Sequence, residues 1–210
     1  MNGFGLAGQL RKATQPLHTI AERSGIMHRL LQGRFDAALY CRLHRNLHAL
    51  YEALEHALDK HADLPSVGPV RFPELYRTAA LREDLRHLHG DDWTRLLIAP
   101  AMQAYVARIQ QVSDSHPSLL VAHAYVRYMG DMSGGQILRD VVRRALDLSS
   151  GAGTMFYAFA PHVSVAAMKE QFRLAMDMLP LGEADVQGVV AEANKAFGLH
   201  VRLFEELNAM

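Results

Sequence analysis

The chain has 210 residues, half of them hydrophobic, which suits one domain with a sizeable core and is cramped for two. Lys plus Arg and Asp plus Glu both number 22, so no overall field favours nucleic acid or an anionic membrane as a partner. Cys41 is the only cysteine and has no disulfide partner, which fits a reducing compartment. The N-terminus has no cationic run before an apolar stretch, and no segment approaches the roughly 20 apolar residues that span a bilayer. We therefore expect one cytoplasmic domain over residues 1–210, with no membrane anchor and no bound nucleic acid.

Apolar residues recur three and four positions apart along nearly every segment, while two-residue alternation over strand length is scarce. This periodicity predicts an all-α fold. A first helix has an apolar stripe formed by Leu6, Leu10, Ala13, Leu17 and Ile20. His18 lies just beside that stripe, and Pro16 costs the helix one hydrogen bond. A second helix, at about residues 35–61, repeats a leucine face formed by Leu39, Leu43, Leu47, Leu50, Leu54 and Leu58.

The helical pattern continues to the end of the chain. Further helices are expected at about residues 73–90, 100–112, 117–148, 164–178 and 183–210. Pro73, Pro100 and Pro117 suit first turns, where proline removes no intrahelical hydrogen bond, and Ser164 suits a cap. Segment 155–162, after a glycine-rich connection, is expected to be extended.

Three glycines, Gly130, Gly134 and Gly135, lie inside the fifth predicted helix, where each costs up to ~1 kcal/mol relative to alanine. Glycine at i and i+4 leaves bare backbone on one face. A flat object can approach such a face closely, and the weakened helix can bend to follow it. The glycines alone leave two alternatives open, which are helix–helix packing and a pair of helices separated by a glycine turn.

The run YMGDMSGGQ, residues 128–136, resembles the distal-helix signature of the haem oxygenase family, usually written YLGDLSGGQ. The differences are Leu-to-Met changes at Met129 and Met132. Far upstream, LRKATQPLHTIAE resembles the family's proximal helix, in which the histidine of an L-x-x-A-T-x-x-x-H pattern ligates the haem iron. NKAFGLHVRLFEEL resembles the family's last conserved helix. The resemblance implies a soluble, bacterial-type member, with haem held between a proximal helix and a kinked distal helix of a multi-helix bundle.

The same resemblance implies roles for residues on both sides of the haem. His18 would be the axial ligand of the iron, and Glu22, one turn later, is a candidate acceptor for the other ring nitrogen. Backbone at Gly130 and Gly134 would cover the opposite side, where Asp131 would anchor a water and relay protons to bound oxygen. A backbone cover, in place of a charged distal pair, suits oxidation of the ring rather than cleavage of the O–O bond.

Further residues match the family's pocket and its rim, where basic side chains would meet the haem propionates. The residues expected to contact haem are Arg11, Tyr125, Gly135, Lys169 and Arg173. His200 stands where relatives often have a polar residue near the distal water network, and its role is left open.

Twelve histidines raise the question of a different metal site. His44 and His48 are four apart on the second helix but lack an H-E-x-x-H sequence, so we interpret them as a surface pair. A di-iron bundle needs two Glu-x-x-His motifs, which the chain lacks, and Asp84 with His87 is the nearest approach. Cys41 has no nucleophile motif and is expected to be a buried helical cysteine.

The resemblance implies an oxidoreductase that uses O2 and three rounds of electron delivery. Haem b, at once substrate and cofactor, would become a biliverdin, carbon monoxide and ferrous iron. The chain has no nucleotide-binding glycine fingerprint, so the electrons would come from a reductase or ferredoxin. A biliverdin reductase, or a protein that uses biliverdin, is a further expected partner.

The alternative is a non-catalytic haem-binding or haem-trafficking protein of the same fold. Asp131 and both key glycines favour the enzyme, because a passive carrier does not need them. A globin-like oxygen carrier gives no account of the GDMSGG run.

Overall fold

A computed structural model describes residues 5–210, and residues 1–4 of the expected single domain lie outside the described part. The helices are α1 (Leu6–Glu22), α2 (Gly25–Leu31), α3 (Ala37–Lys60), α4 (Thr78–His89), α5 (Pro100–Ser115), α6 (Leu120–Ala145), α7 (Val165–Asp177) and α8 (Glu183–Ala209). Short 3-10 turns lie between them at Gly68–Val70, Pro73–Leu75, Asp91–Arg95, Pro117–Leu119 and Met155–Tyr157. No strand occurs within residues 5–210, so the all-α prediction is confirmed.

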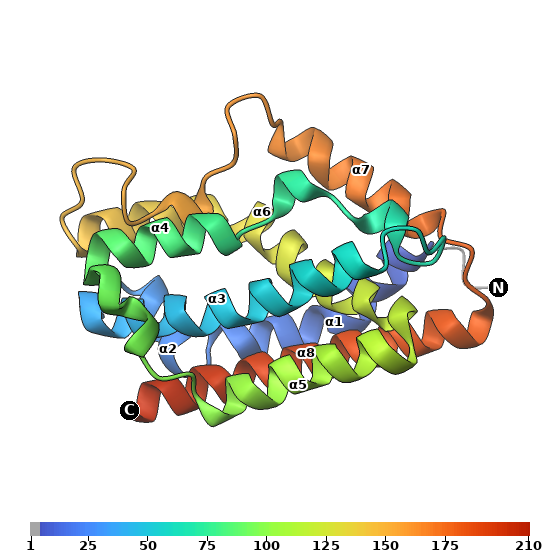
Figure 1. Ribbon diagram of the computed structural model, residues 1–210, viewed down its shortest axis with the longest axis horizontal. Helices are drawn as coiled ribbons and strands as arrows, with labels where there is room; N and C mark the ends of the chain where they lie inside the picture. Colours follow the sequence, from blue (N-terminus) through green and yellow to red (C-terminus); the bar gives the residue numbers. More distant parts are fainter. Residues whose placement is uncertain (1–4) are drawn as a thin grey trace.

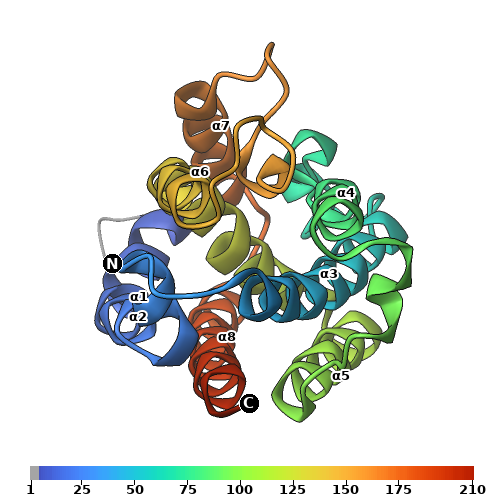
Figure 2. The same ribbon diagram turned by 90° about the vertical axis from the view of Figure 1, so that its left-hand side faces the viewer.

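Helix α8 organises the bundle. It packs against α1, α2, α5 and α6, so the last helix of the chain contacts helices from its beginning and its middle. In Figure 1, α5 and α8 run along one side, α3 lies next to them, and α4, α6 and α7 lie on the other side. Figure 2 shows α6 above α1 and α2, with α7 beyond it. Helices α1 and α6, which are expected to flank the haem, are thus held by shared neighbours, since both pack against α2, α7 and α8.

Several local signals produce the predicted elements. All six leucines of the second predicted helix are buried on α3, which begins after Asp36, whose side chain accepts the Leu39 N–H at 2.8 Å. Pro100 occupies the first turn of α5, and the Ser164 hydroxyl accepts the Ala167 N–H at the start of α7. Among the described residues, no helix is both long enough and apolar enough to span a membrane.

Helix α1 buries a different stripe from the predicted one. Leu6 and Leu10 are buried as expected, but Leu17 is only half-buried and Ile20 is 49% exposed. Thr14 and Ala21 are buried instead, so the helix is rotated relative to the expectation. Thr14 can be buried because its hydroxyl donates to the Leu10 carbonyl oxygen at 2.8 Å.

Two segments differ from the sequence-based expectation. Helix α2 was not predicted, because it spans only seven residues and begins at Gly25 with a φ of 43°. A Cβ at Gly25 would lie 2.0 Å from the Phe204 carbonyl oxygen, so glycine permits α2 to approach α8. Segment 155–162, expected to be extended, starts with the turn Met155–Tyr157, because the Asp84 carboxylate accepts the N–H groups of Met155 and Phe156, both at 2.8 Å.

Helix α6 remains a continuous helix through its three glycines, which excludes two helices separated by a glycine turn. Figure 1 shows its first half running obliquely across the bundle and its second half turning nearly parallel to the long axis of the molecule. The same change of direction is visible end-on in Figure 2. The bend matches the kink predicted for a helix weakened by glycine.

Candidate functional site

The α1 side of the candidate site presents one imidazole. His18 is exposed and lies edge-on to Phe197 of α8, with ring centroids 6.1 Å apart. Its Nδ1 atom lies 3.7 Å from a Glu22 carboxylate oxygen, one turn along the helix. The predicted acceptor is therefore on the Nδ1 side, and Nε2 is the ring atom left to bind a ligand.

The α6 side presents bare backbone at two of the three predicted glycines. A Cβ built at Gly130 or Gly134 would meet no other atom within 4 Å, so both positions face open space. Gly135 differs, because it is buried and a Cβ there would lie 3.7 Å from the Tyr157 ring. Packing against the Met155–Tyr157 turn therefore accounts for Gly135, and the structure does not place it on the open face with the other two.

The Asp131 carboxylate, next to Gly130, is held at both oxygens. Arg127, one turn earlier on α6, donates from Nη2 to Oδ1 at 3.0 Å, and the Tyr51 hydroxyl of α3 donates to Oδ2. Arg127 also donates from Nε to the Tyr51 oxygen at 2.9 Å, which closes a three-residue ring. Its Nη1 points to Nε2 of His200 on α8, again at 2.9 Å. Asp131 is thus fixed in direction as well as in position.

The electrostatics of this ring suit a carboxyl that exchanges protons. Burial raises the pKa of Asp131, while the Arg127 guanidinium and the Tyr51 hydrogen bond oppose that rise. Burial also raises the pKa of Tyr51 well above its ordinary value, so its hydroxyl stays protonated. A buried carboxyl with a raised pKa can take up and release a proton more readily near neutral pH than an ordinary aspartate.

Basic side chains gather where α1, α6 and α7 meet. Arg11 and Arg173 are exposed, and both lie close enough to the Tyr125 hydroxyl of α6 to oppose the rise that burial causes in its pKa. Lys169 lies one turn before Arg173 on α7 and is half-buried. The structure therefore brings Arg11, Tyr125 and Arg173 together, with Lys169 on the same helix as Arg173.

Three residues of the Asp131 network were missed by the sequence reasoning or left without a role. Arg127 had a usable signal, because Arg and Asp four apart on a helix form an ion pair. Tyr51 had none, since it lies among the leucines of α3 and meets Asp131 only through the packing of α3 against α6. His200 was noted without a role, and its partner Arg127 becomes known only from the fold.

The interpretation of His44 and His48 as a surface pair is wrong. Both are buried, His44 with its ring centroid 3.9 Å from that of Tyr40 and His48 with its centroid 4.9 Å from that of Trp93. Burial lowers the pKa of His44 to about 3, so it is a neutral core residue. The reason is tertiary, since α4 and the turns after α4 and α6 cover that face of α3.

The other metal and nucleophile alternatives also fail. In the part of the chain that the structure describes, no group of three or more His, Cys, Asp and Glu side chains could hold a metal ion. Asp84 is buried and bonds to the backbone of the 155–156 turn. Cys41 is buried as expected, and burial raises its pKa to about 11, so it is not an activated thiol.

Comparison with known proteins gives consistent results over nearly the whole chain. The family model described as heme oxygenase matches residues 4–206. A heme oxygenase of Pyropia yezoensis is 42% identical over 205 residues, which cover 97% of this chain and 86% of that protein. The crystal structure of heme oxygenase-1 from the cyanobacterium Synechocystis in complex with heme superimposes with a TM-score of 0.94 at 40% identity, covering 98% of this chain and 93% of that one. Heme oxygenase from Leptospira interrogans gives a TM-score of 0.92 at 36% identity, covering 97% of this chain and all of that one.

Proposed function

The chain belongs to the haem oxygenase family, whose reaction converts haem to biliverdin, carbon monoxide and iron, and we propose that His18 and Asp131 carry that reaction from opposite sides of the substrate. The observation that carries the proposal is the Asp131 carboxylate. It is held at both oxygens by Arg127 and Tyr51, and it lies between the open glycine positions Gly130 and Gly134.

Haem is the substrate of this reaction, and it supplies both the iron that binds O2 and the ring that is oxidised. His18 would ligate the iron through Nε2, with the Glu22 carboxylate 3.7 Å from Nδ1 on the other side of the ring. The exposed imidazole and the open backbone of α6 fit a flat macrocycle, because Gly130 and Gly134 carry no side chain that would keep it away.

The distal side supplies protons without a charged group that contacts the iron. Backbone groups at Gly130 and Gly134 can bond ordered water, and Asp131 would hold that water and hand it protons. Arg127 and Tyr51 keep the carboxylate aimed in one direction, so the protons arrive at one place. This arrangement supports oxidation of the ring over unproductive cleavage of the O–O bond.

The propionates of haem would meet the basic residues Arg11, Lys169 and Arg173. The convergence of Arg11 and Arg173 at Tyr125 supports this assignment, since charged donors bind carboxylates strongly at a partly buried rim. Much of the affinity would still come from covering the apolar ring. These side chains therefore orient haem more than they retain it.

Electrons and further partners lie outside the chain. A reductase or ferredoxin would supply the electrons, because the sequence has no nucleotide-binding glycine fingerprint. A biliverdin reductase or a biliverdin-using protein would take the product. A location in the cytoplasm, expected from the single cysteine, remains part of the proposal.

The proposal is tested with the purified protein, one equivalent of haem, and ascorbate or a reductase as donor. We expect the Soret band to decay and biliverdin and carbon monoxide to appear. His18→Ala is the matched control, and its turnover should fall unless imidazole is added. A wild-type protein that binds haem but keeps its Soret band with every donor would favour the haem-carrier alternative.

A further inference from the structure

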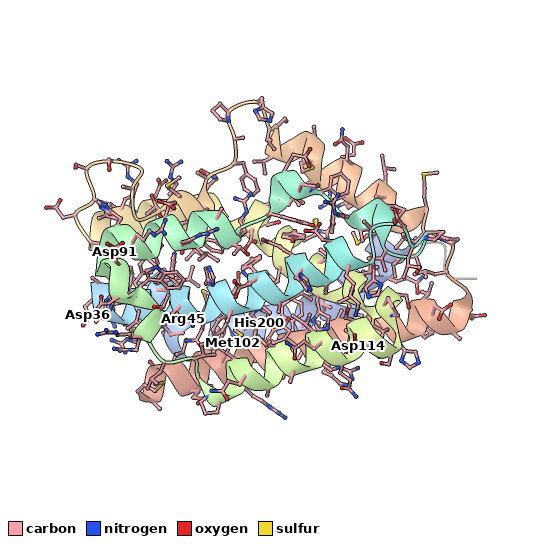
Figure 3. The ribbon with its side chains drawn as sticks, in the orientation of Figure 1. Asp36, Arg45, Asp91, Met102, Asp114 and His200 are labelled. Atoms are coloured by element: carbon pink, nitrogen blue, oxygen red, sulfur yellow. The ribbon has the colours of Figure 1, made fainter. Side chains whose placement is uncertain are left out.

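His200 is a buried histidine whose two ring nitrogens both have partners. It is 2% exposed and lies in the middle of α8, in the interior of the bundle (Figure 3). Its Nδ1 is 2.9 Å from the Ala196 carbonyl oxygen, and its Nε2 is 2.9 Å from Nη1 of Arg127. The ring edge also packs on Tyr105 of α5, with centroids 5.0 Å apart, and on Phe204 at 5.8 Å. The imidazole therefore has little freedom to turn.

These partners allow only one protonation form of the ring. A carbonyl oxygen only accepts, so Nδ1 must carry the hydrogen. A guanidinium only donates, so Nε2 must be a bare acceptor. An imidazolium would turn an N–H towards the guanidinium of Arg127, which is itself charged. His200 is thus a neutral imidazole with its hydrogen on Nδ1.

Arg127 makes one contact from each of its three nitrogens. Nε donates to Tyr51, Nη2 to Asp131 and Nη1 to His200. Tyr51 and Asp131 also bond to each other, so they could move together as one unit. The His200 contact differs because it ties the guanidinium to α8, outside that unit.

We propose that His200 is a positioning residue for the proton-relay carboxylate, because it fixes the Arg127 guanidinium and thereby fixes Asp131. The inference rests on the proposed function of Asp131 and adds a residue that does not touch the substrate. Without an acceptor at this position, Arg127 is free to turn about its side chain, and Asp131 loses a defined partner.

The charged and titratable groups around His200 agree with a permanently neutral ring. Burial, and then the charge of Arg127, lower the pKa of His200 to about 3. Burial raises the pKa of Tyr105 above its ordinary value, so its hydroxyl stays protonated. His123 of α6 also faces this region, and its Nε2 lies 3.2 Å from the buried carboxylate of Glu192. The carboxylates that face this cluster, Asp131 and Glu192, are thus paired with Arg127 and His123 rather than with His200.

The first test uses the wild-type protein and needs no catalysis. Protein with 15N-labelled histidine is followed by NMR from about pH 5 to about pH 8, where an ordinary histidine titrates. We expect His200 to show a protonated Nδ1 and a bare Nε2 throughout. A hydrogen on Nε2, or a titration within this range, would overturn the proposal.

The second test compares His200→Leu with His200→Gln. Leucine removes the acceptor and keeps the bulk, whereas the glutamine amide oxygen can reach the place of Nε2 and accept from Arg127. In His200→Leu, the pKa of Asp131, read from its carboxyl 13C signal, should rise further by roughly one unit, and turnover should fall roughly tenfold or more. In His200→Gln both should return close to wild type.

The outcomes separate this inference from the proposed function. Both variants should bind haem with the wild-type His18 spectrum. A His200→Leu variant that folds and keeps the wild-type Asp131 pKa would refute the positioning role, even if wild type turns haem over. A wild type that fails to turn haem over would instead refute the proposed function. If His200→Leu does not fold, His200→Gln and the NMR test still decide.

Discussion

The two substitutions Asp131→Ala and Asp131→Asn separate haem binding, stability and proton relay. Alanine removes both acceptor oxygens, so the Arg127 guanidinium loses its counter-charge and the Tyr51 hydroxyl loses its acceptor. Asparagine keeps an amide oxygen for Arg127 and can donate to the Tyr51 oxygen, but it cannot carry the relayed proton.

The magnitudes follow from the burial of the pair. Arg127 and Asp131 have side chains that are 13% and 8% exposed. Removing one partner of a buried ion pair costs about 3–5 kcal/mol, a large share of the roughly 5–15 kcal/mol that holds a domain folded. We expect Asp131→Ala to lose about 3 kcal/mol of unfolding free energy and Asp131→Asn about half as much. Both should lose about a hundredfold or more in turnover, because both lack the proton carrier.

The assay follows absorbance of the haem complexes with ascorbate or a reductase, together with denaturant unfolding of the apoproteins. Neither variant should change the haem spectrum, because the His18 bond does not depend on Asp131. An Asp131→Asn variant as fast as wild type would show that the carboxylate relays no proton. Turnover that falls only in the alanine variant would assign Asp131 a structural role alone.

Three further changes test other parts of the site and its support. His18→Ala should lose the axial-ligand spectrum and regain it with added imidazole, and an unchanged spectrum would refute the ligand assignment. Gly134→Ala should leave the apoprotein as stable as wild type or up to ~1 kcal/mol more stable, yet impair haem binding and turnover, because the new methyl group enters the open face. Gly135→Ala is its control and should turn over normally, since its methyl group would meet Tyr157 at 3.7 Å. Burial alone would raise the pKa of Glu192, but the hydrogen bonds from Arg108 and His123 lower this pKa from 4.5 to about 2. The ionised carboxylate therefore stabilises the fold above about pH 4.5, and this stabilisation is lost as the pH falls towards 2. Glu192→Gln should therefore cost roughly 2–3 kcal/mol at neutral pH and progressively less below about pH 4.5, and a cost that does not change with pH would contradict the ion pair.

Local patterns predicted the elements that depend on local physics. The leucine repeat of α3 is buried as expected, and Pro100 and Ser164 mark helix starts through effects within one turn. The nine-residue motif around Asp131 predicted the bend and the open glycine positions, because each follows from missing side chains on one helix. His18 and Asp131 could be proposed as site residues from the sequence because each lies within a motif.

Long-range contacts account for what the sequence did not predict. Tyr51 and Asp131 are 80 residues apart, and only the packing of α3 against α6 brings the hydroxyl to the carboxylate. His44 and His48 were interpreted as a surface pair, yet Phe156 packs against the His44 ring and Trp93 against the His48 ring. Ile20 shows the converse, since it fits the predicted apolar stripe of α1 yet is 49% exposed.

The glycines of α6 serve two purposes, ligand access and close packing, and each purpose applies to different positions. Gly130 and Gly134 leave the backbone open to a ligand, whereas Gly135 lets the Tyr157 ring approach from the other side. Gln136, the next residue, donates from its side chain to the Tyr157 carbonyl oxygen at 3.1 Å. Asp84 and Arg77 hold the 155–158 segment in place, the first through backbone N–H groups and the second through the Ala158 carbonyl oxygen at 2.6 Å. The three glycines lower the helical stability of α6 by roughly 3 kcal/mol relative to alanine. Contacts with the 155–158 segment on one side of α6 offset this loss, so the helix can stay bent, with exposed backbone on the side where haem is proposed to bind.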